Sequence, residues 1–375
     1  MPGPTTAGAV PPGRVRTLAQ MYRRFGEVDA AGTSPLYERV AVALSESAEA
    51  LRAIETAPAR RRHPTVILAA LHDLALAGRA PALAAAYAAA DGDAAAGAAI
   101  DTLLRMPDAV VAAAVRRPVR AGETGRCAVL YPAIAEAARR TGAHTVGLID
   151  VGCSAGLNLS VDRVGITYDS GQSLGDPSSP VQQSSSVVGG RAVPAQAMPE
   201  VVTRIGIDLD PVDVTDADEA RWLRACLSPD QPERAARLDA ELALAATAPP
   251  LLLRGDAVEV LPDALARVPA DALPVVTTTW ALSSFPLESR LRFLQRLDEA
   301  ATRRTVAWVS AEGVGVAPAI PTFGDRRASG HSIIGLAQFG HSGLRADAIG
   351  RCWSRGRLLS WLADSWQGAS GVRGS

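Results

Sequence analysis

The residues best suited to chemistry lie in one short stretch, residues 147–162, with the sequence GLIDVGCSAGLNLSVD. An apolar run ends at Asp150 and passes directly into a turn that contains Gly152, Ser154 and Gly156. This pattern predicts a buried parallel strand, a tight loop and then a helix. Small residues let a ligand approach the backbone closely, and the N-terminus of a helix offers free N–H groups. Because an acid before the loop suits a ribose or amino group better than a phosphate, the stretch favours a nucleoside site of the S-adenosylmethionine type.

Two other kinds of glycine-rich site fit this stretch less well. A Rossmann dinucleotide loop has its third glycine at the position that Leu157 occupies, and an acid about 20 residues later. A P-loop has a lysine after its second glycine, and this chain contains no lysine at all. A tight turn between a strand and a helix, with no ligand, remains the alternative for this loop.

The absence of lysine also restricts the chemistry. Schiff-base catalysis and the anchoring of pyridoxal phosphate both use a lysine amine, so both are excluded. Asn158 is the only asparagine in the chain, and it lies inside the glycine-loop stretch. We expect this asparagine to have a polar task at the site, although capping the helix or fixing the loop explains it equally well.

The composition of the chain indicates an ordinary globular protein without a polyanionic or lipid partner. The 375 residues have a formal net charge of −1 and include only five Phe and five Tyr, so neither a basic surface nor a base-stacking platform is expected. No apolar run approaches the roughly 20 residues that span a bilayer. The four cysteines are scattered, which predicts reduced thiols in the cytoplasm and no metal site. We therefore expect a small-molecule substrate, without nucleic acid or membrane.

Two regions of different pattern divide the chain. Residues 16–142 have helical periodicity and predict an N-terminal helical subdomain. Residues 143–366 alternate apolar runs with helical segments, which predicts an α/β domain with a mostly parallel sheet. We expect strands at 201–208, 250–256, 274–280 and 305–310 besides the one before the glycine loop, and a closing pair of strands around a turn at 340–343. Residues 1–15 and 367–375 are expected to be tails.

A long connection interrupts the predicted α/β domain. Residues 163–199 are rich in Ser, Gly, Gln and Pro and have little apolar periodicity. The segment is longer than a usual connection between a strand and a helix. It predicts a lid or an inserted hairpin over the site, with a surface loop without a role as the alternative.

Acids stand at the ends of three successive predicted strands. Asp150 ends the first, Asp208 ends the second and Asp256 ends the third. The two oxygens of Asp208 are suited to both ribose hydroxyls, with Asp210 as a competitor, and Asp256 is suited to an adenine amino group. Turns favour Asp in any case, but the repetition of the pattern indicates a nucleoside site at the carboxyl edge of the sheet.

These segments together resemble an actinobacterial family known as domain of unknown function 2332. The matching segments, in chain order, are SPLY (34–37), LHDLALAGRAP (71–81), RPV with E-x-G-R (117–126), GCSAGLNL (152–159), GDP-x-SPV (175–181) and GIDLDPVD (206–213). The resemblance implies a core similar to class I methyltransferases, with S-adenosylmethionine held by the loop and the strand-end acids. The residues implied are Asp150, Gly152, Ser154, Gly156, Asn158, Asp208 and Asp256.

The chain also departs from the patterns that it resembles. Ser154 replaces the middle glycine of the methyltransferase loop. Residues 120–123 (RAGE) stand where the family is expected to have Gln-Thr-Asn-Glu, and residues 278–280 (TTW) stand where it has a His-Ser pair. Some relatives in natural-product pathways are similar to enzymes that have left methyl transfer and close aziridine rings by expelling sulfate. The resemblance therefore implies two reactions rather than one.

Each reaction predicts its own catalytic residues. Methyl transfer needs alignment and a base, for which Glu123 and Glu312 are the candidates, with His331 and His341 as alternatives. Ring closure needs cations aimed at a departing anion, and guanidinium groups are suited to that task. The candidates are Arg117, Arg120 and Arg126, with Trp280 as a wall that excludes water.

The sequence thus leaves three hypotheses open. The first is an S-adenosylmethionine-dependent methyltransferase that acts on a small molecule in bacterial secondary metabolism. The second is an enzyme with the same fold that closes a ring without the cofactor, together with a small partner protein or as a homo-oligomer. The third is a non-catalytic scaffold whose nucleoside pocket has decayed.

Overall fold

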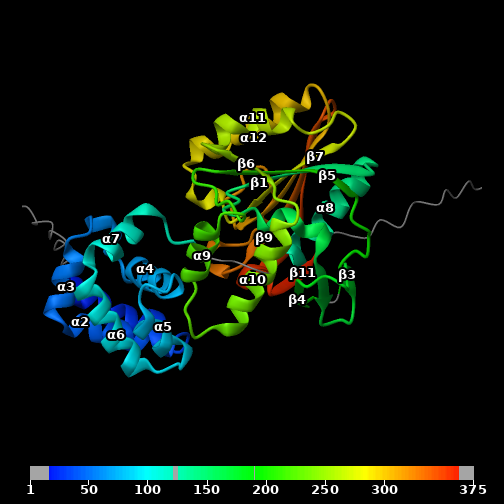
Figure 1. Cartoon of the computed structure of the whole chain (residues 1–375). Coiled ribbons are helices and arrows are strands. Elements are labelled where there is room, and N and C mark those ends of the chain that lie inside the picture. Colours follow the sequence, from blue (N-terminus) through cyan, green and yellow to red (C-terminus); the bar gives the residue numbers. More distant parts are fainter. Residues whose placement is uncertain (1–16, 121–125, 190, 363–375) are drawn as a thin grey trace, which may run out of the picture. The chain divides into compact units, whose positions relative to one another are not determined.

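The chain forms two compact units in a computed structural model that describes residues 17–120, 126–189 and 191–362 (Figure 1). The first unit comprises Met1–Gly122 together with Arg221–Ala235, and the second comprises Glu123–Ala220 together with Ala236–Ser375. The predicted tails, residues 1–15 and 367–375, lie outside the described residues. The predicted boundary at residue 142 falls at the end of a helix that packs in the core of the second unit.

Helices make up the first unit. The helices pack around a hydrophobic core of buried residues such as Tyr22, Val40, Leu44, Ile67 and Leu71. Several helices begin at a proline. Proline suits the first turn because a backbone N–H at that position would have no acceptor within the helix. The helices are α1 (Leu18–Arg24), a π-helical turn (Phe25–Ala30), α2 (Pro35–Glu46), α3 (Ala48–Glu55), α4 (Pro64–Leu76), α5 (Pro81–Ala88), α6 (Gly92–Arg105) and α7 (Pro107–Arg116). A short 3-10 turn, Ala59–Arg61, precedes α4.

The length of these helices bears on the membrane prediction. Within the described part of the chain, no single helix is long and apolar enough to cross a membrane. Helices α4 and α5 reach that length only when they are joined, and they meet at a bend of 99°.

An eleven-stranded sheet organises the described part of the second unit, in the order β3-β2-β4-β11-β10-β9-β8-β7-β1-β5-β6. The strands predicted from the sequence are all present, within a few residues at their ends. The strands are β1 (Thr145–Val151), β2 (Gly165–Tyr168), β3 (Ser173–Gly175), β4 (Gln182–Val187), β5 (Glu200–Asp208), β6 (Leu251–Arg254), β7 (Leu273–Thr279), β8 (Val306–Gly313), β9 (Ser332–Gly340), β10 (Gly343–Trp353) and β11 (Leu358–Trp361).

The prediction of a mostly parallel sheet is wrong, because the sheet is mixed. Strands β6-β5-β1-β7-β8 are parallel neighbours, whereas β9 runs antiparallel to both β8 and β10. The short turn at Gly340–Gly343 accounts for the antiparallel pairing of β9 with β10, since a tight turn joins antiparallel strands and only a longer crossover joins parallel ones. Strands β8 and β9 pair antiparallel across the longer connection at 314–331. The predicted closing pair of strands around this turn is confirmed.

The insert at 163–199 also adds strands. Strands β2 and β3 form an antiparallel pair, and β4 joins β2 to β11. The segment therefore contains the predicted inserted hairpin, and its strands extend the sheet edge beyond β11 rather than lying across the ends of β1 and β5.

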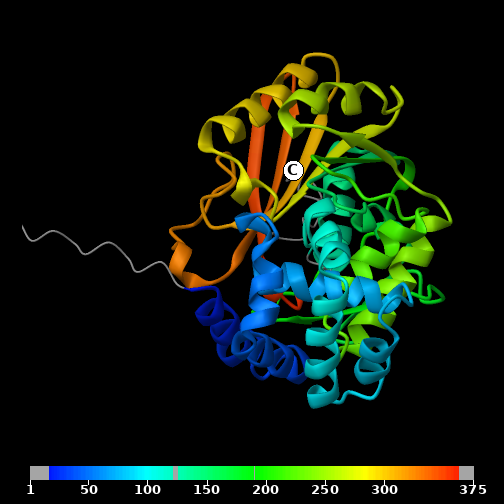
Figure 2. The same cartoon turned by 60° about the vertical axis from the view of Figure 1, so that its left-hand side comes forward.

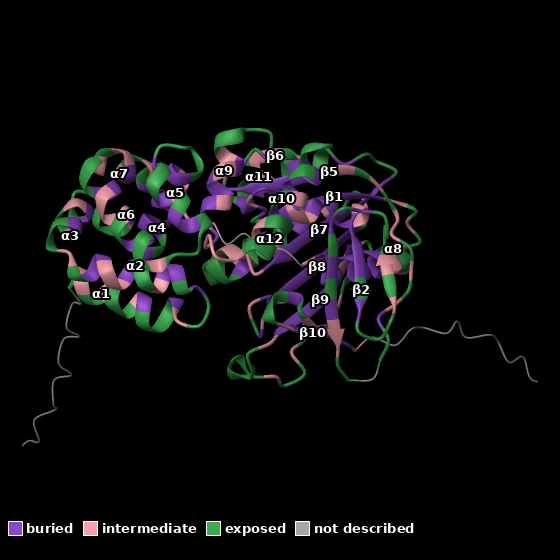
Figure 3. Ribbon diagram, turned by 60° about the horizontal axis from the view of Figure 1, so that its bottom comes forward, coloured by how far each residue is buried: buried purple, intermediate pink, exposed green. Residues whose placement is uncertain are grey.

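Helices cover both faces of the sheet in the second unit. Helix α8 (Cys127–Thr141) packs on one face, against Leu148, Val275 and Val309. Helices α11 (Ala257–Ala266) and α12 (Leu287–Ala301) lie beside each other on the opposite face (Figure 2). Figure 3 shows that the central strands are buried along their length. Helices α9 (Ala217–Ala225) and α10 (Pro232–Ala246) contribute residues to both units.

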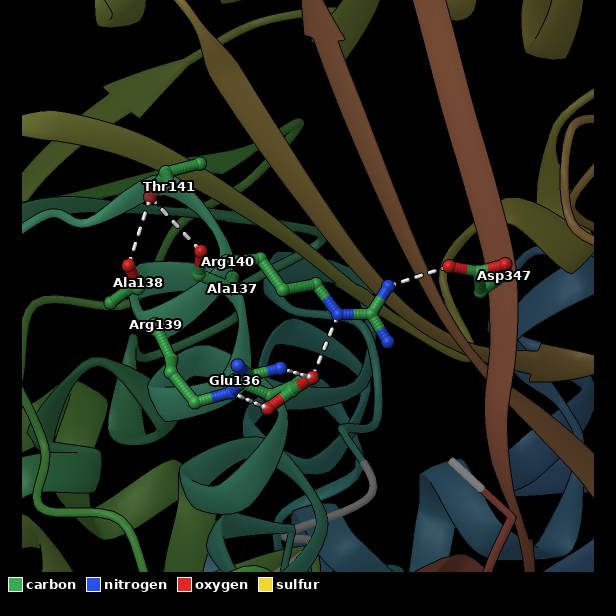
Figure 4. Close-up of polar contacts among 7 residues, drawn as sticks. All are labelled: Glu136, Ala137, Ala138, Arg139, Arg140, Thr141 and Asp347. Atoms are coloured by element: carbon green, nitrogen blue, oxygen red, sulfur yellow. Dashed lines mark hydrogen bonds and ion pairs between the residues drawn. The ribbon is translucent and has the colours of Figure 1, made fainter. Parts of the chain in front are cut away.

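An ion cluster around the buried Glu136 attaches α8 to the sheet (Figure 4). Glu136 accepts hydrogen bonds from Arg139 and Arg140 on the same helix, and Arg140 also pairs with Asp347 on β10. Burial alone raises the pKa of the Glu136 carboxyl, but the two arginines outweigh that effect and hold the pKa below its usual value.

The segment after the glycine loop differs from the prediction of a regular helix. Residues Leu157–Arg163 form 3-10 turns, and Ser160, at φ −93° and ψ 18°, interrupts them. Gly156 precedes this segment in the left-handed conformation, at φ 69°. No α-helix begins at the loop, so its N–H groups do not form the helical N-terminus that the sequence led us to expect.

The contact between Gly147 on β1 and Val268, two residues after the end of α11, gives a test of the fold. A Cβ at Gly147 would lie 2.4 Å from Cγ1 of Val268. We expect Gly147→Ala to lower the free energy of unfolding by about 1–3 kcal/mol, as overpacking does. Denaturant unfolding checks this value. Gly340→Ala on β9 is the control, because its Cβ would meet Thr305 Oγ1 at 3.4 Å; an equal loss in both variants would contradict this account.

Candidate functional site

The carboxyl ends of the parallel strands meet at one edge of the sheet. Numbered by their own order along the chain, the strands β6-β5-β1-β7-β8 read 3-2-1-4-5, so the direction of winding reverses between β1 and β7. In open α/β sheets ligands bind at such a reversal, outside the carboxyl ends of the strands. The predicted residues Asp150, Asp208, Trp280 and Glu312 all lie at this edge.

Asp150 is deeply buried, with 1% of its surface exposed. Its Oδ1 accepts the hydroxyl of Thr277 at 2.7 Å, and its Oδ2 accepts Nδ2 of Asn158 at 3.1 Å. Burial raises the pKa of the Asp150 carboxyl, while these two hydrogen bonds and the Arg126 charge oppose the rise. Both oxygens are therefore used inside the protein.

Asn158 connects this acid to the next strand. Its Nδ2 lies 3.4 Å from Oγ1 of Thr279 as well as 3.1 Å from Asp150. The only asparagine in the chain thus makes the contacts expected of the alternative, in which it fixes the segment after the loop. Because Nδ2 is committed to these contacts, the carbonyl oxygen Oδ1 is left as an acceptor.

Arg126 lies at the head of α8 and reaches the end of β7. Its Nη1 donates to the carbonyl of Thr279 at 3.1 Å and to the hydroxyl of the same residue at 2.8 Å. The guanidinium carbon lies 5.2 Å from the centre of the Trp280 ring, within the range of a cation–π contact. Burial lowers the pKa of Arg126, and the charges of Asp150 and Glu312 oppose that effect.

Trp280 forms the other half of this pair. It has φ 55°, a left-handed conformation that is unusual for a bulky residue. Its Nε1 donates to Oγ of Ser332 at 2.8 Å, which joins the end of β7 to the start of β9. Residues held in such conformations cluster at functional sites.

Glu312 fixes the turn after Trp280 through hydrogen bonds to its backbone. Its Oε1 accepts the N–H groups of Ala281 at 3.0 Å and Leu282 at 3.1 Å, and only 1% of its surface is exposed. Its Oε2 is buried and makes no hydrogen bond to the described residues. Burial raises the pKa of Glu312 to about 7, although the N–H groups, the nearby Thr278 hydroxyl and the Arg126 charge act in the opposite direction.

The loop acids are engaged with the loop itself. Oδ2 of Asp208 accepts the N–H of Ser154 at 2.9 Å, and its Oδ1 accepts the N–H of Asp210 at 2.9 Å. Asp208 is 9% exposed. Ser154 occupies the position of the middle glycine with φ 52°, a conformation that glycine adopts more easily.

Asp256 and the two loop glycines also have roles within the fold. Asp256 caps the N-terminus of α11, where its side chain accepts the N–H of Val258. A Cβ at Gly152 would lie 2.8 Å from Cβ of Ala281, and a Cβ at Gly156 would lie 2.8 Å from Cγ of Pro250. The chain itself therefore fills the space that the glycines leave.

These contacts decide how well S-adenosylmethionine fits the predicted residues. An adenosyl group needs an open face on the loop and an acid with oxygens directed at the ribose. Ala281 and Pro250 cover the two glycines, and the oxygens of Asp150 and Asp208 already accept hydrogen bonds within the chain. This arrangement therefore offers an adenosyl group fewer free acceptor sites and less open backbone than the sequence predicted.

The remaining candidates are spread over other parts of the chain. Glu123 lies outside the described residues. Arg117 and Arg120 belong to the first unit. His331 lies next to Ser332, where it contacts Asp325 at 2.9 Å, and its ring lies 5.4 Å from that of Trp353 at an angle of 47°. His341 is exposed in the turn between β9 and β10, at the opposite end of the sheet.

Four residues of this edge did not come out of the sequence analysis as site residues: Thr277, Thr279, Gln183 and Glu241. The threonines had a signal, because polar residues end the apolar run PVVTTTW. Glu241 had a signal too, because it is an acid on the apolar face of α10, which carries Leu238, Leu242 and Ala245. Gln183 lies in the serine-rich insert and had no signal.

The sequence motifs of the first unit have a common partner in the structure. Oγ of Ser34, in SPLY, donates to Asp230, and Nδ1 of His72, in LHDL, contacts the carbonyl of Leu227. Asp73 pairs with Arg221. These motifs hold the segment Arg221–Ala235, which returns to the first unit after β5.

The comparisons with known proteins agree with the resemblance noted from the sequence. A search of curated proteins gives no match to the chain. Residues 19–361 match the family model described as "Uncharacterized protein conserved in bacteria (DUF2332)". Because that match covers most of the chain, the protein belongs to the DUF2332 family.

Proposed function

We propose that the second unit is an enzyme that carries out a nucleophilic displacement at carbon on a small molecule, at the edge formed by the ends of β1, β7 and β8. The observation that carries this proposal is the placement of Arg126, Trp280 and Glu312 around the end of β7. A partly buried cation, an aromatic wall and a carboxyl group with a pKa of about 7 are the groups that such a displacement uses.

The reaction favoured by these groups is a ring closure within one substrate. An amine nitrogen attacks the neighbouring carbon, and the C–N bond forms as the C–O bond to a sulfate ester breaks. Sulfate leaves with the bonding electron pair, and the ammonium proton that remains goes to a base. Arg126 stabilises the departing anion, since a guanidinium group matches the oxygens of a sulfate. Glu312 is the candidate base because its pKa lies near neutrality.

Methyl transfer from S-adenosylmethionine is the second candidate. The strand order around the reversal at β1 and β7, with acids at the ends of β1 and β5, is the observation that favours it. The contacts of Asp150, Asp208, Gly152 and Gly156 argue against it, as described above. We therefore place methyl transfer behind the ring closure, in which the leaving group belongs to the substrate.

Calorimetric titration with S-adenosylmethionine separates the two candidates. We expect no saturable binding at micromolar concentrations, together with the release of sulfate from members of a panel of sulfated β-amino alcohols. Micromolar binding that Asp208→Ala weakens would overturn the ring closure and support methyl transfer. An absence of both binding and turnover would reject both reactions and leave the scaffold hypothesis.

A further inference from the structure

A small cavity lies beside the Asp150 network in the second unit. It has a volume of about 10 Å³, close to the least space that holds one water molecule. Cys127, Asn158, Ser160, Gln183 and Glu241 contribute its polar lining. The apolar lining comes from Leu157, Val164 and Leu244.

The orientation of Gln183 sets the polarity of this cavity. Its Oε1 accepts the N–H of Cys127 at 3.1 Å, and its Nε2 donates to Oε1 of Glu241 at 3.2 Å. Asn158 likewise directs its Nδ2 at Asp150 and Thr279. Both side-chain amides therefore use donors elsewhere. Among the lining residues this leaves three acceptors, namely Oδ1 of Asn158, the carboxyl group of Glu241 and the hydroxyl of Ser160, beside the thiol of Cys127.

Glu241 is a charged residue in a buried position, with 6% of its surface exposed. It lies on α10 among the buried residues Leu238, Leu242 and Ala245. A carboxylate in such surroundings is costly unless a cation or several donors compensate for it. Gln183 supplies one donor. The charges that act on Glu241 are those of Arg237, which is exposed on the same helix, and Arg126 at the head of α8.

We propose that this cavity binds the ammonium head of a primary amine, with Glu241, Asn158 and Ser160 accepting its three N–H groups. The size of the cavity supports this assignment, because an –NH₃⁺ group occupies about the space of one water molecule. The acceptor lining supports it as well, since an ammonium group has donors and no acceptor. A quaternary ion such as tetramethylammonium is too large for the cavity and has no N–H group to donate.

This inference rests on the proposed function in one respect, namely that the bound amine is the nucleophile of the displacement. The bound ammonium group first gives one proton to the Glu241 carboxylate, which frees the lone pair of the nitrogen for the attack, and the second proton leaves after the C–N bond has formed. The cavity and the Arg126–Trp280 pair share the Asn158–Thr279 contact. An amine held in the cavity is thus placed next to the group that stabilises the leaving anion. The experiment below measures binding alone, so its failure is distinct from a failure of the sulfate-release assay.

Thermal unfolding in the presence of small cations tests the cavity directly. At constant ionic strength and pH 8, we expect ammonium and methylammonium to raise Tm by roughly 2–4 °C at saturation, because a ligand of the folded state stabilises it. Sodium and tetramethylammonium are not expected to do so. Glu241→Gln keeps the shape and the acceptor for Gln183 but removes the charge, and it should abolish the rise. Glu288→Gln, an exposed glutamate on α12, is the matched control and should keep it.

Three results would overturn the proposal. The first is an equal rise in Tm with tetramethylammonium and with ammonium, and the second is a rise with ammonium that survives in Glu241→Gln. The third is no change in Tm with ammonium at concentrations up to about 0.2 M, where weak one-site binding becomes measurable. If Glu241→Gln does not fold, Ser160→Ala replaces it, since removing one of the three acceptors should weaken ammonium binding severalfold.

Discussion

Arg126→Met is expected to lower the rate of sulfate release about 10³-fold, the upper part of the range for losing a group that stabilises a developing anion. Methionine keeps an unbranched chain of similar length beside Trp280 but removes the guanidinium group, which donates to Thr279 and lies 5.2 Å from the ring. The loss should appear in kcat/KM, measured by free sulfate from a substrate of the panel. Arg126→Lys should give an intermediate rate, because it keeps the charge without the fork of donors.

The control for this prediction is Arg345→Met. Arg345 is exposed on β10, so its replacement changes the net charge equally without touching the edge. Circular dichroism and Tm of the three variants show whether the fold is retained. A rate in Arg126→Met within threefold of the wild type, in a folded protein, would remove Arg126 from the proposed chemistry.

Much of the fold could be predicted because strands and their ends leave strong local signals. The apolar runs that end at Asp150 and Asp208 correspond to β1 and β5, and the glycines at 340 and 343 correspond to the turn between β9 and β10. The direction of β9 could not be predicted from hydrophobicity. Pairing direction depends on the length of the connection and on where the next strand finds a free edge, and neither leaves a pattern in the strand itself.

The candidate site shows a different limit. The sequence pointed to the carboxyl edge of the parallel strands, and the structure brings several of the predicted residues together there: Arg126, Asp150, Asn158, Trp280 and Glu312. It could not show that the acids are engaged internally, because an Asp that binds a ribose and an Asp that binds a backbone N–H have the same sequence pattern. Nor could it bring Gln183 from the insert to Glu241 on α10, a contact between residues 58 positions apart.

Glycine loops illustrate the same difficulty. A glycine is required wherever φ is positive or a neighbour is close, whether that neighbour is a ligand or the chain itself. At Gly152 the neighbour is Ala281, which follows the left-handed Trp280. The turn after β7 thus takes the place beside the loop that we expected a ligand to occupy, and only the three-dimensional arrangement distinguishes the two cases.

The stability of the protein is expected to fall as pH rises from about 5 to 8, in part because of Glu241 and Glu312. Burial raises the pKa of each carboxyl from 4.5 to about 7. Between these values the folded state keeps a proton that the unfolded state has released, so unfolding becomes more favourable with increasing pH. A shift of this size corresponds to about 3 kcal/mol for each residue once the pH exceeds 7.

The difference in the free energy of unfolding between each Glu→Gln variant and the wild type isolates this effect. Glutamine cannot ionise, so Glu312→Gln and Glu241→Gln should each gain about 3 kcal/mol relative to the wild type between pH 5 and pH 8, as measured by denaturant unfolding across that range. Glu136→Gln should give a flat difference between pH 5 and pH 8 and the opposite slope only below about pH 4.5, in a series extended to lower pH, because Arg139 and Arg140 lower the pKa of Glu136 and its contribution is lost only below the unfolded pKa. Glu288→Gln, which is exposed, should give a flat difference. If the Glu312 and Glu241 variants also give flat differences, burial does not raise these two pKa values, and Glu312 loses its qualification as a base near neutral pH.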